Sequence, residues 1–401
     1  MSGQASSDGL NSVVSSFAHP FPGPEDSVLE VLTLYCASLS LSRALQLHGD
    51  IVARQSPGLS EVLNSWVACR QRTFWDPLLG RLREVCATQR PGSCYLTLIE
   101  CALRAHFDGM VGSWTFQLTA PTRLRIGPWI LPSATSGQIE SLRDRGISLR
   151  LKSEDGSVHH LNFCQTTDGN SWRVGAATPP LIELPSISFS DSQIVLLPHY
   201  LVSERLLPEV PGARFLEVPE LAEVAERVRC ARDLISKHSP RYINWVDRSL
   251  SCLASSNSPK RGSGSHPSFP GLLVMSNDPR PSAIAEMLVH EASHQYFFMA
   301  TLLGPVDDGS DAQQYYSPLV GRARPIDKLL LSFHALGNMM LLFRNCIASG
   351  IDDSGYCRTR LASITSQINQ VGEALQKTTS LTQLGKALWE PLSKLLVQTS
   401  E

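Results

Sequence analysis

The sequence predicts an α+β fold that is mostly α-helical, with a central β-rich subdomain and a helical metal-binding core containing an H-E-x-x-H motif. Apolar residues recur at helical spacing from residue 26 to about residue 106, and strand-like alternation follows up to about residue 200. Helical spacing returns near residue 219 and includes the motif at residues 290–294. The 401 residues, 42% of them hydrophobic, are enough for more than one packed domain.

Bulk composition excludes several classes of function. The formal net charge is −2 and 18% of the residues are charged, so no basic surface for nucleic acid is expected. The first thirty residues lack a positive start followed by an apolar run, which a secretory signal needs. No stretch reaches the roughly 18 uninterrupted apolar residues of a membrane helix. We therefore expect a soluble cytoplasmic protein without nucleic-acid or membrane partners.

The N-terminal part divides into a short tail and a helical region. Residues 1–25 are rich in Ser, Gly and Pro, and we expect them to be disordered. Residues 26–113 show helical periodicity, which Pro57-Gly58 and Pro91-Gly92 break into separate helices. The first of these helices is indicated by apolar residues that recur at steps of three and four: Val28, Val31, Leu32 and Tyr35.

The central region, residues 114–200, is expected to form the β-rich subdomain. Its clearest signal is a hairpin between Ile147 and Phe163, in which Leu149 and Leu151 continue an alternation of apolar and polar residues. Asp155-Gly156 supplies the turn. Because strand side chains alternate between two faces, the neighbouring histidines 159 and 160 cannot chelate one ion together.

Residues 201–401 are expected to be the helical, metal-binding catalytic region. A polar segment without periodicity, residues 255–270, predicts a flexible surface loop or a lid over a site. Residues 272–275 read as a short buried strand. The chain then turns, and Ser282 is the expected N-cap of a helix running to about Leu303.

That helix contains the candidate metal ligands His290 and His294, with Glu291 between them. Residues four apart lie on one face of a helix, so both imidazoles can bind one ion. Glu291 stands three residues before His294 and reaches the edge of the same site. In a zinc hydrolase Glu291 is the catalytic base that activates water, whereas in an oxygenase it is a metal ligand or an anchor of the ligands.

The third ligand has to come from elsewhere, and two protease patterns do not fit. Metzincins place Gly and His where this chain has Phe297 and Ala300, so that class is excluded. Gluzincin-type proteases take a glutamate from a following helix, but no glutamate occurs between Glu291 and Glu373. The commonest zinc protease arrangement is therefore disfavoured.

His334 is the expected third ligand. It lies in a largely apolar segment between residues 327 and 346, and a buried imidazole needs a partner, which a metal would provide. A hydrogen bond within the core is the other way to satisfy it. The alternative ligands are Asp307, Asp308 and Asp327, any of which would complete the two-histidine, one-carboxylate set of non-haem iron.

Two arginines, Arg322 and Arg324, precede this apolar segment in a stretch held by Pro318 and Pro325. A guanidinium group binds a carboxylate through two parallel hydrogen bonds. An endopeptidase has no need of such a group, whereas an oxygenase that consumes 2-oxoglutarate needs a cation for the distal carboxylate of that cosubstrate. The arginines therefore favour an oxygenase, although a surface salt bridge is the simpler interpretation for at least one of them.

Taken together, these motifs resemble a known family. The short strand at residues 271–275 leads into P-S-A-I-A-E-M-L-V-H-E-x-x-H, and Y-Y-S-P-L-x-x-R-x-R-P and an apolar helix with Phe333-His334-Ala335 follow. This order resembles the HExxH-type peptide modification proteins of bacterial ribosomal-peptide natural-product (RiPP) clusters. The resemblance implies iron(II)- and 2-oxoglutarate-dependent β-hydroxylation of a residue in a precursor peptide. It also implies His290, His294 and His334 as metal ligands and Arg324 as the 2-oxoglutarate anchor.

Three hypotheses remain open from the sequence. The first is a non-haem iron oxygenase that uses 2-oxoglutarate and O2 to hydroxylate an amino-acid side chain in a peptide or carrier-bound precursor. The second is a zinc metallopeptidase in which Glu291 is the general base. The third is a non-catalytic protein with a structural metal, in which an edge strand of the β-rich subdomain pairs with an extended peptide.

Overall fold

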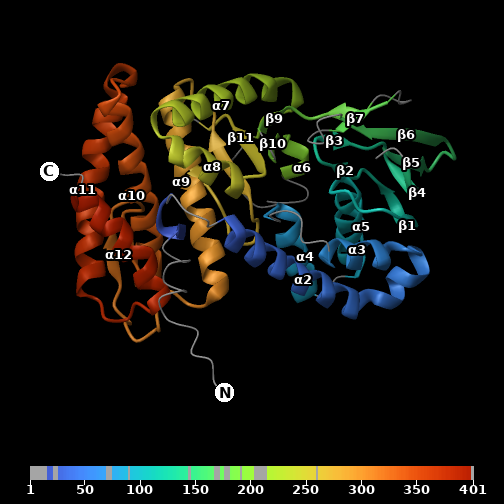
Figure 1. The fold of residues 1–401 in the computed structure, drawn as a ribbon, viewed down its shortest axis with the longest axis horizontal. Coiled ribbons are helices and arrows are strands. Elements are labelled where there is room, and N and C mark those ends of the chain that lie inside the picture. The colour runs from blue at the N-terminus through green and yellow to red at the C-terminus, as the bar shows by residue number, and fades with distance from the viewer. Residues whose placement is uncertain are drawn as a thin grey trace.

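The structure is a computed structural model that describes residues 16–20, 26–68, 75–88, 91–142, 146–166, 172–175, 181–189, 192–202, 215–258 and 261–398. It is 56% helical and 22% strand, which confirms the predicted, mostly helical α+β class. Along the longest axis, the C-terminal helices occupy one end, and the sheet that contains β4 to β7 occupies the other (Figure 1). The expected disorder of residues 1–25 falls mainly outside the described residues, but residues 16–20 are buried.

Between residues 26 and 107, the described residues form α2 (Asp26–Gln55), α3 (Leu59–Ala68), α4 (Pro77–Thr88) and α5 (Pro91–Phe107). The chain turns at Pro57-Gly58 between α2 and α3, where Gly58 has a φ of +85°. A Cβ at this position would lie 2.6 Å from the carbonyl oxygen of Ser113, so only glycine fits both the backbone angle and the close approach.

The apolar residues that indicated α2 are only partly buried. Leu32 is buried, but Val31 and Tyr35 are 67% and 60% exposed. The helix packs on α3, α4 and α5, and the apolar positions of α2 extend beyond the side that these neighbours cover. Periodicity identified a helix here, but the packing partners decided which of its apolar residues are buried. The side chain of Val28 lies outside the described residues.

The β-rich region begins with a five-stranded antiparallel sheet in the order β1-β4-β5-β6-β7. Its strands are β1 (Ser113–Thr122), β4 (Ala134–Leu142), β5 (Gly146–Lys152), β6 (Val158–Gln165) and β7 (Trp172–Val174). The predicted hairpin is confirmed as β5 and β6, with Leu149 opposite Leu161. At its turn, the backbone N–H of Ser157 donates to Asp155. A small sheet joins β2 (Arg125–Ile126), β3 (Trp129–Ile130) and β8 (Ile182–Glu183).

A second five-stranded sheet, in the order β12-β13-β11-β10-β9, leads to the metal motif. It consists of β9 (Ser186–Phe189), β10 (Ser192–Leu196), β11 (Cys252–Ser256), β12 (Ser263–Gly264) and β13 (Leu272–Ser276), and β10, β11 and β13 run parallel. The connection between β10 and β11 contains α6 (His199–Leu201), α7 (Val218–His238) and α8 (Pro240–Ser249). Strand β13 is the buried strand predicted before the motif.

The segment at residues 255–270, expected to be a flexible loop or lid, contributes to this sheet. Its first two residues end β11, and β12 pairs antiparallel with Val274 and Met275. Residues 259–260 lie outside the described residues. Arg261, which precedes β12, forms an ion pair with Glu286 of the motif helix. The segment therefore contacts the core through β11, through β12 and through this ion pair.

The C-terminal region consists of α9 (Pro281–Ala300), η2 (Thr301–Leu303), β14 (Tyr315–Ser317), β15 (Arg322–Arg324), α10 (Ile326–Ala348), η3 (Asp353–Gly355), α11 (Tyr356–Lys377) and α12 (Gln383–Gln398). Helix α10 packs against α9, α11 and α12. By length and composition alone α10 could cross a membrane, but 78% of its apolar window is buried inside the protein. Such burial is typical of a core helix.

The predicted N-cap of the motif helix is wrong by two residues. The N-cap is Arg280, and Pro281 occupies the first helical position. Proline suits that position because its fixed φ is helical and its missing N–H would have no intrahelical acceptor. Ser282 is therefore inside the helix, where its backbone N–H donates to Asp353 of η3 at 3.2 Å.

Candidate metal centre

Helix α9 is a central helix, and its first turns are surrounded by protein. Every residue from Ser282 to Val289 is buried, and the helix packs against α7, α8, α10 and β13. In Figure 1 it stands between the second sheet and the C-terminal helices. Burial on nearly all sides explains why its sequence is apolar apart from a few polar residues, of which three form the candidate centre.

His290, Glu291 and His294 each offer one ligand atom, and these three atoms lie within 4.8 Å of one another. The two imidazole rings are perpendicular, with centroids 4.5 Å apart. Nε2 of His290 lies 3.6 Å from Oε1 of Glu291. Two ligands at about 2.1 Å from a tetrahedral ion would be about 3.4 Å apart, so the residues present fit a small divalent cation.

The environment of the Glu291 carboxylate is the observation that most favours a bound cation. Its side chain is 0% exposed, and neither oxygen has a hydrogen-bond partner. An ionised carboxylate that is buried without a partner is strongly destabilising, and such groups are paired or coordinate metals. Nε2 of His290, 3.6 Å from Oε1, lies beyond hydrogen-bonding distance of the carboxylate. A cation between the two ligand atoms would neutralise the charge and satisfy both groups.

His294 is held in the neutral form that metals bind. Its pKa is lowered well below the ordinary value, mainly because burial disfavours the imidazolium, and the nearby charges of His290, His334 and Arg324 act in the same direction. Nδ1 of His294 is buried without a hydrogen-bond partner. Because a neutral imidazole has a free lone pair, His294 needs no deprotonation to bind a metal near neutral pH.

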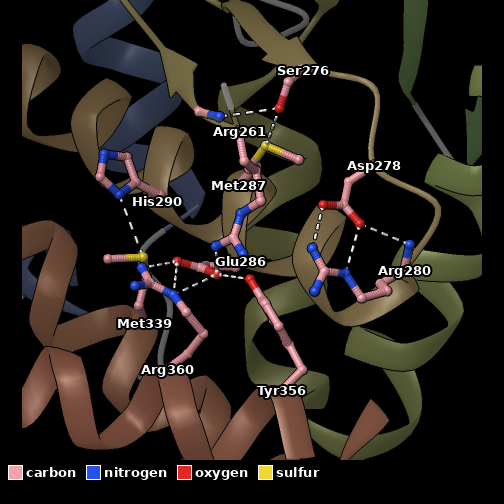
Figure 2. Close-up of polar contacts among 11 residues, drawn as sticks. Arg261, Ser276, Asp278, Arg280, Glu286, Met287, His290, Met339, Tyr356 and Arg360 are labelled. Carbon is pink, nitrogen blue, oxygen red and sulfur yellow. Dashed lines mark hydrogen bonds and ion pairs between the residues drawn. The ribbon is translucent and has the colours of Figure 1, made fainter. Parts of the chain in front are cut away.

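His290 is oriented by a residue of α10. Its Nδ1 lies 3.4 Å from Sδ of Met339, as Figure 2 shows. The side chain of His290 is 21% exposed and His294 is also half-buried, so both imidazoles have some contact with solvent whereas Glu291 has none. The sequence pattern gave no reason to single out Met339, because one methionine in an apolar helix looks like any other core residue.

Glu286, one turn before His290, joins three segments of the chain. Its carboxylate accepts hydrogen bonds from Arg261, Arg360 and the hydroxyl of Tyr356 (Figure 2). Burial and the neighbouring Glu286 carboxylate raise the pKa of Tyr356, which keeps this hydroxyl a donor. Sequence reasoning missed this residue, although a glutamate four positions before a ligand in an apolar helix was a usable signal.

His334, the predicted third ligand, does not join the cluster. It is fully buried in α10, and its Nε2 donates to the backbone carbonyl oxygen of Phe17 at 2.7 Å. Burial lowers the pKa of His334 to about 4, so the imidazole is neutral. The prediction that a buried His334 needs a partner was right, but here the partner is a carbonyl from the N-terminal segment, and Nε2 is occupied.

The alternative aspartate ligands are also engaged elsewhere. Asp307 accepts the N–H of Gly309, and Asp308 accepts the N–H and hydroxyl of Ser310. Asp327 pairs with Lys328 at the start of α10. Within the described part of the chain, the carboxylate that the structure places beside the two histidines is Glu291.

Arg322 and Arg324 lie on β15, which pairs with β14 so that Arg324 is opposite Tyr315 and Arg322 is opposite Ser317. Cross-strand partners and alternate residues share a face, so both arginines are on the same side of the hairpin. Arg324 is half-buried and close enough to affect His294, whereas Arg322 is exposed. Among the described residues no carboxylate pairs with either guanidinium.

Comparison with protein-family models and with curated proteins finds no match to this chain. The functional interpretation therefore depends on the geometry and chemistry of the site.

Proposed function

We propose that the chain is a non-haem iron(II)- and 2-oxoglutarate-dependent oxygenase. Its expected reaction is hydroxylation of an amino-acid side chain, at the β-carbon, in a peptide or a carrier-bound natural-product precursor. The observation that carries this proposal is the unpartnered, fully buried carboxylate of Glu291 between two histidines. Two histidines and one carboxylate with open positions are the ligand set typical of such oxygenases.

In this proposal His290, His294 and Glu291 hold the metal, and bound iron(II) supplies dioxygen activation with 2-oxoglutarate as reductant. Arg324 binds the distal carboxylate of 2-oxoglutarate, which is supported by its position near His294 and its lack of a carboxylate partner among the described residues. The hydroxyl of Ser317, buried without a hydrogen-bond partner on the same face of the hairpin, is available as a second donor. Arg322, which is exposed on the same face, adds a second positive charge for this carboxylate.

The setting of the site supports the same reaction. The buried Met339 lies against His290 and limits access of water, which strengthens charge interactions within the site. We place the protein in the cytoplasm, a reducing compartment in which iron(II) persists.

A zinc metallopeptidase is the second candidate, because Glu291 has the sequence position of the general base in that class. Against it, the next glutamates along the chain are exposed on α11 and α12, namely Glu373 and Glu390, so neither supplies the third ligand of the gluzincin type. A peptidase would also leave Arg324 without a role. The third candidate, a non-catalytic peptide-binding protein with a structural metal, leaves both arginines unexplained.

The test is anaerobic reconstitution with iron(II), followed by titration with 2-oxoglutarate and detection of the visible charge-transfer band of the iron chelate. We expect a band with the wild type and none with His294→Ala, while Glu373→Gln, an exposed glutamate, matches the wild type. Stoichiometric zinc without a band would favour the peptidase. Bound metal with neither a band nor peptide hydrolysis would favour the non-catalytic protein.

A further inference from the structure

Met339 reaches the candidate centre from a different helix. It lies in the middle of α10, is 1% exposed, and places its sulfur 3.4 Å from Nδ1 of His290. Figure 2 shows this contact on the side of His290 that faces α10. The two residues are 49 positions apart, so the contact exists because α9 and α10 pack together.

The chemistry of sulfur decides which nitrogen of His290 is protonated. A thioether accepts hydrogen bonds weakly and cannot donate them, so a hydrogen bond to Sδ requires a proton on Nδ1. In the neutral ring Nε2 then has the free lone pair. That nitrogen is the one that lies 3.6 Å from Oε1 of Glu291, on the side of the cluster.

We infer that Met339 is a positioning residue of the metal centre. Its thioether selects the Nδ1–H form of His290 and fixes the ring so that Nε2 points toward Glu291 and His294. This inference rests on the proposed metal site and adds a residue to it. In the described part of the chain the other ligand, His294, has no hydrogen-bond partner at Nδ1, so of the two imidazoles it is His290 that Met339 orients.

The choice of sulfur has a consequence for the metal. Metal-bound histidines usually donate their second N–H to a carboxylate, a carbonyl or water, which makes the imidazole a stronger ligand, and losing that partner typically weakens metal binding 10–100-fold. A thioether orients the ring but polarises it less than an oxygen acceptor. Replacing sulfur by an oxygen acceptor should therefore preserve or tighten metal binding, whereas removing the acceptor should weaken it.

The test measures the affinity of the metal-free protein for cobalt(II), by competition with a chelator and by the visible absorption of the bound ion. Met339→Leu keeps the apolar volume and removes the acceptor, and we expect the Kd for cobalt(II) to rise about tenfold. Met339→Gln has similar length and an amide oxygen, and we expect a Kd at or below that of the wild type. Met340→Leu makes the same change one residue later, at a side chain that is 2% exposed, and should leave the Kd unchanged.

Unchanged cobalt(II) affinity in Met339→Leu overturns the inference. Equal losses in Met339→Leu and Met339→Gln also overturn it, because they indicate packing alone. If Met339→Gln does not fold, the difference between Met339→Leu and Met340→Leu decides the question. A wild type that binds no cobalt(II) overturns the metal site itself, which distinguishes failure of the proposed function from failure of this inference alone.

Discussion

The backbone carbonyl oxygen of Phe17 accepts a hydrogen bond from Nε2 of His334 across 317 positions of sequence. Beside it, the amide of Asn338 donates to the carbonyl oxygen of Ala18 at 3.0 Å. The ring of Phe17 packs against Tyr296 on α9, with centroids 5.9 Å apart. The described N-terminal segment therefore belongs to the core that surrounds the metal-binding helix.

Phe17→Ala should lower the free energy of unfolding by about 3 kcal/mol, the usual cost of removing a fully buried phenylalanine ring. The physical reason is the cavity left against Tyr296, since Phe17 is 2% exposed. Urea denaturation followed by circular dichroism measures the change. Val31→Ala removes a side chain that is 67% exposed and should change stability by less than about 0.5 kcal/mol. Equal effects of the two substitutions would contradict the buried position of Phe17.

The free energy of unfolding should fall as the pH decreases from 6.5, the ordinary pKa of histidine, to about 4. In the folded protein burial lowers the pKa of His334 to about 4, so between these values the unfolded chain binds a proton that the folded chain does not. Above pH 6.5 the neutral, buried His334 makes its full contribution to the free energy of unfolding, about 3 kcal/mol. Measuring unfolding at a series of pH values should show a flatter profile for His334→Gln, whose amide can still donate to Phe17.

The exposed His160→Gln provides the control for this measurement and should reproduce the pH profile of the wild type. A His334→Gln profile as steep as that of the wild type would show that other groups cause the acid sensitivity.

Glu291→Gln should weaken metal binding at least tenfold, whereas His334→Gln should retain one metal per chain. The reason is that the Glu291 carboxylate faces the two histidines without any other partner, while Nε2 of His334 is bound to Phe17. Metal content after gel filtration, together with competition against a chelator, separates the two variants. Loss of metal from His334→Gln with its fold intact would restore His334 as the third ligand.

Arg324→Gln should raise the Kd for 2-oxoglutarate by about tenfold or more, because a charge-assisted pair with a carboxylate contributes about 1.5–3 kcal/mol. Metal content should not change. The matched substitution, Arg322→Gln, removes an exposed guanidinium from the same face of the hairpin and should have a smaller effect. Titration of the visible band measures both. Unchanged 2-oxoglutarate affinity in Arg324→Gln would remove the proposed role of this residue.

Glu286→Gln should lower the free energy of unfolding by about 3 kcal/mol, since it leaves two partly buried guanidinium groups, those of Arg261 and Arg360, without their counter-charge. Thermal or urea unfolding checks this prediction. Glu373→Gln changes an exposed glutamate of α11 and should be nearly neutral. A neutral Glu286→Gln would mean that the arginines find other partners at no cost.

The sequence by itself determined the features that depend on residues close together in the chain, namely helix faces, hairpins and helix starts. The step of four between His290 and His294 placed both imidazoles on one helix face, and alternation around Asp155-Gly156 gave the hairpin of β5 and β6. Proline positions marked where helices begin, although the N-cap of α9 differed because Pro281 itself starts the helix. These features follow from backbone geometry over a few residues, which the sequence carries directly.

Only the tertiary structure decided which distant groups meet. In the folded protein His334 binds the carbonyl oxygen of Phe17 rather than joining the cluster. Met339 contacts His290, and Glu286 forms ion pairs with Arg261 and Arg360. It also left Tyr35 exposed on a helix that its apolar periodicity had indicated. The sequence predicts that a buried polar side chain has a partner, but it does not identify that partner. Which partner satisfies it depends on which helix faces pack together, and that choice involves residues tens to hundreds of positions apart.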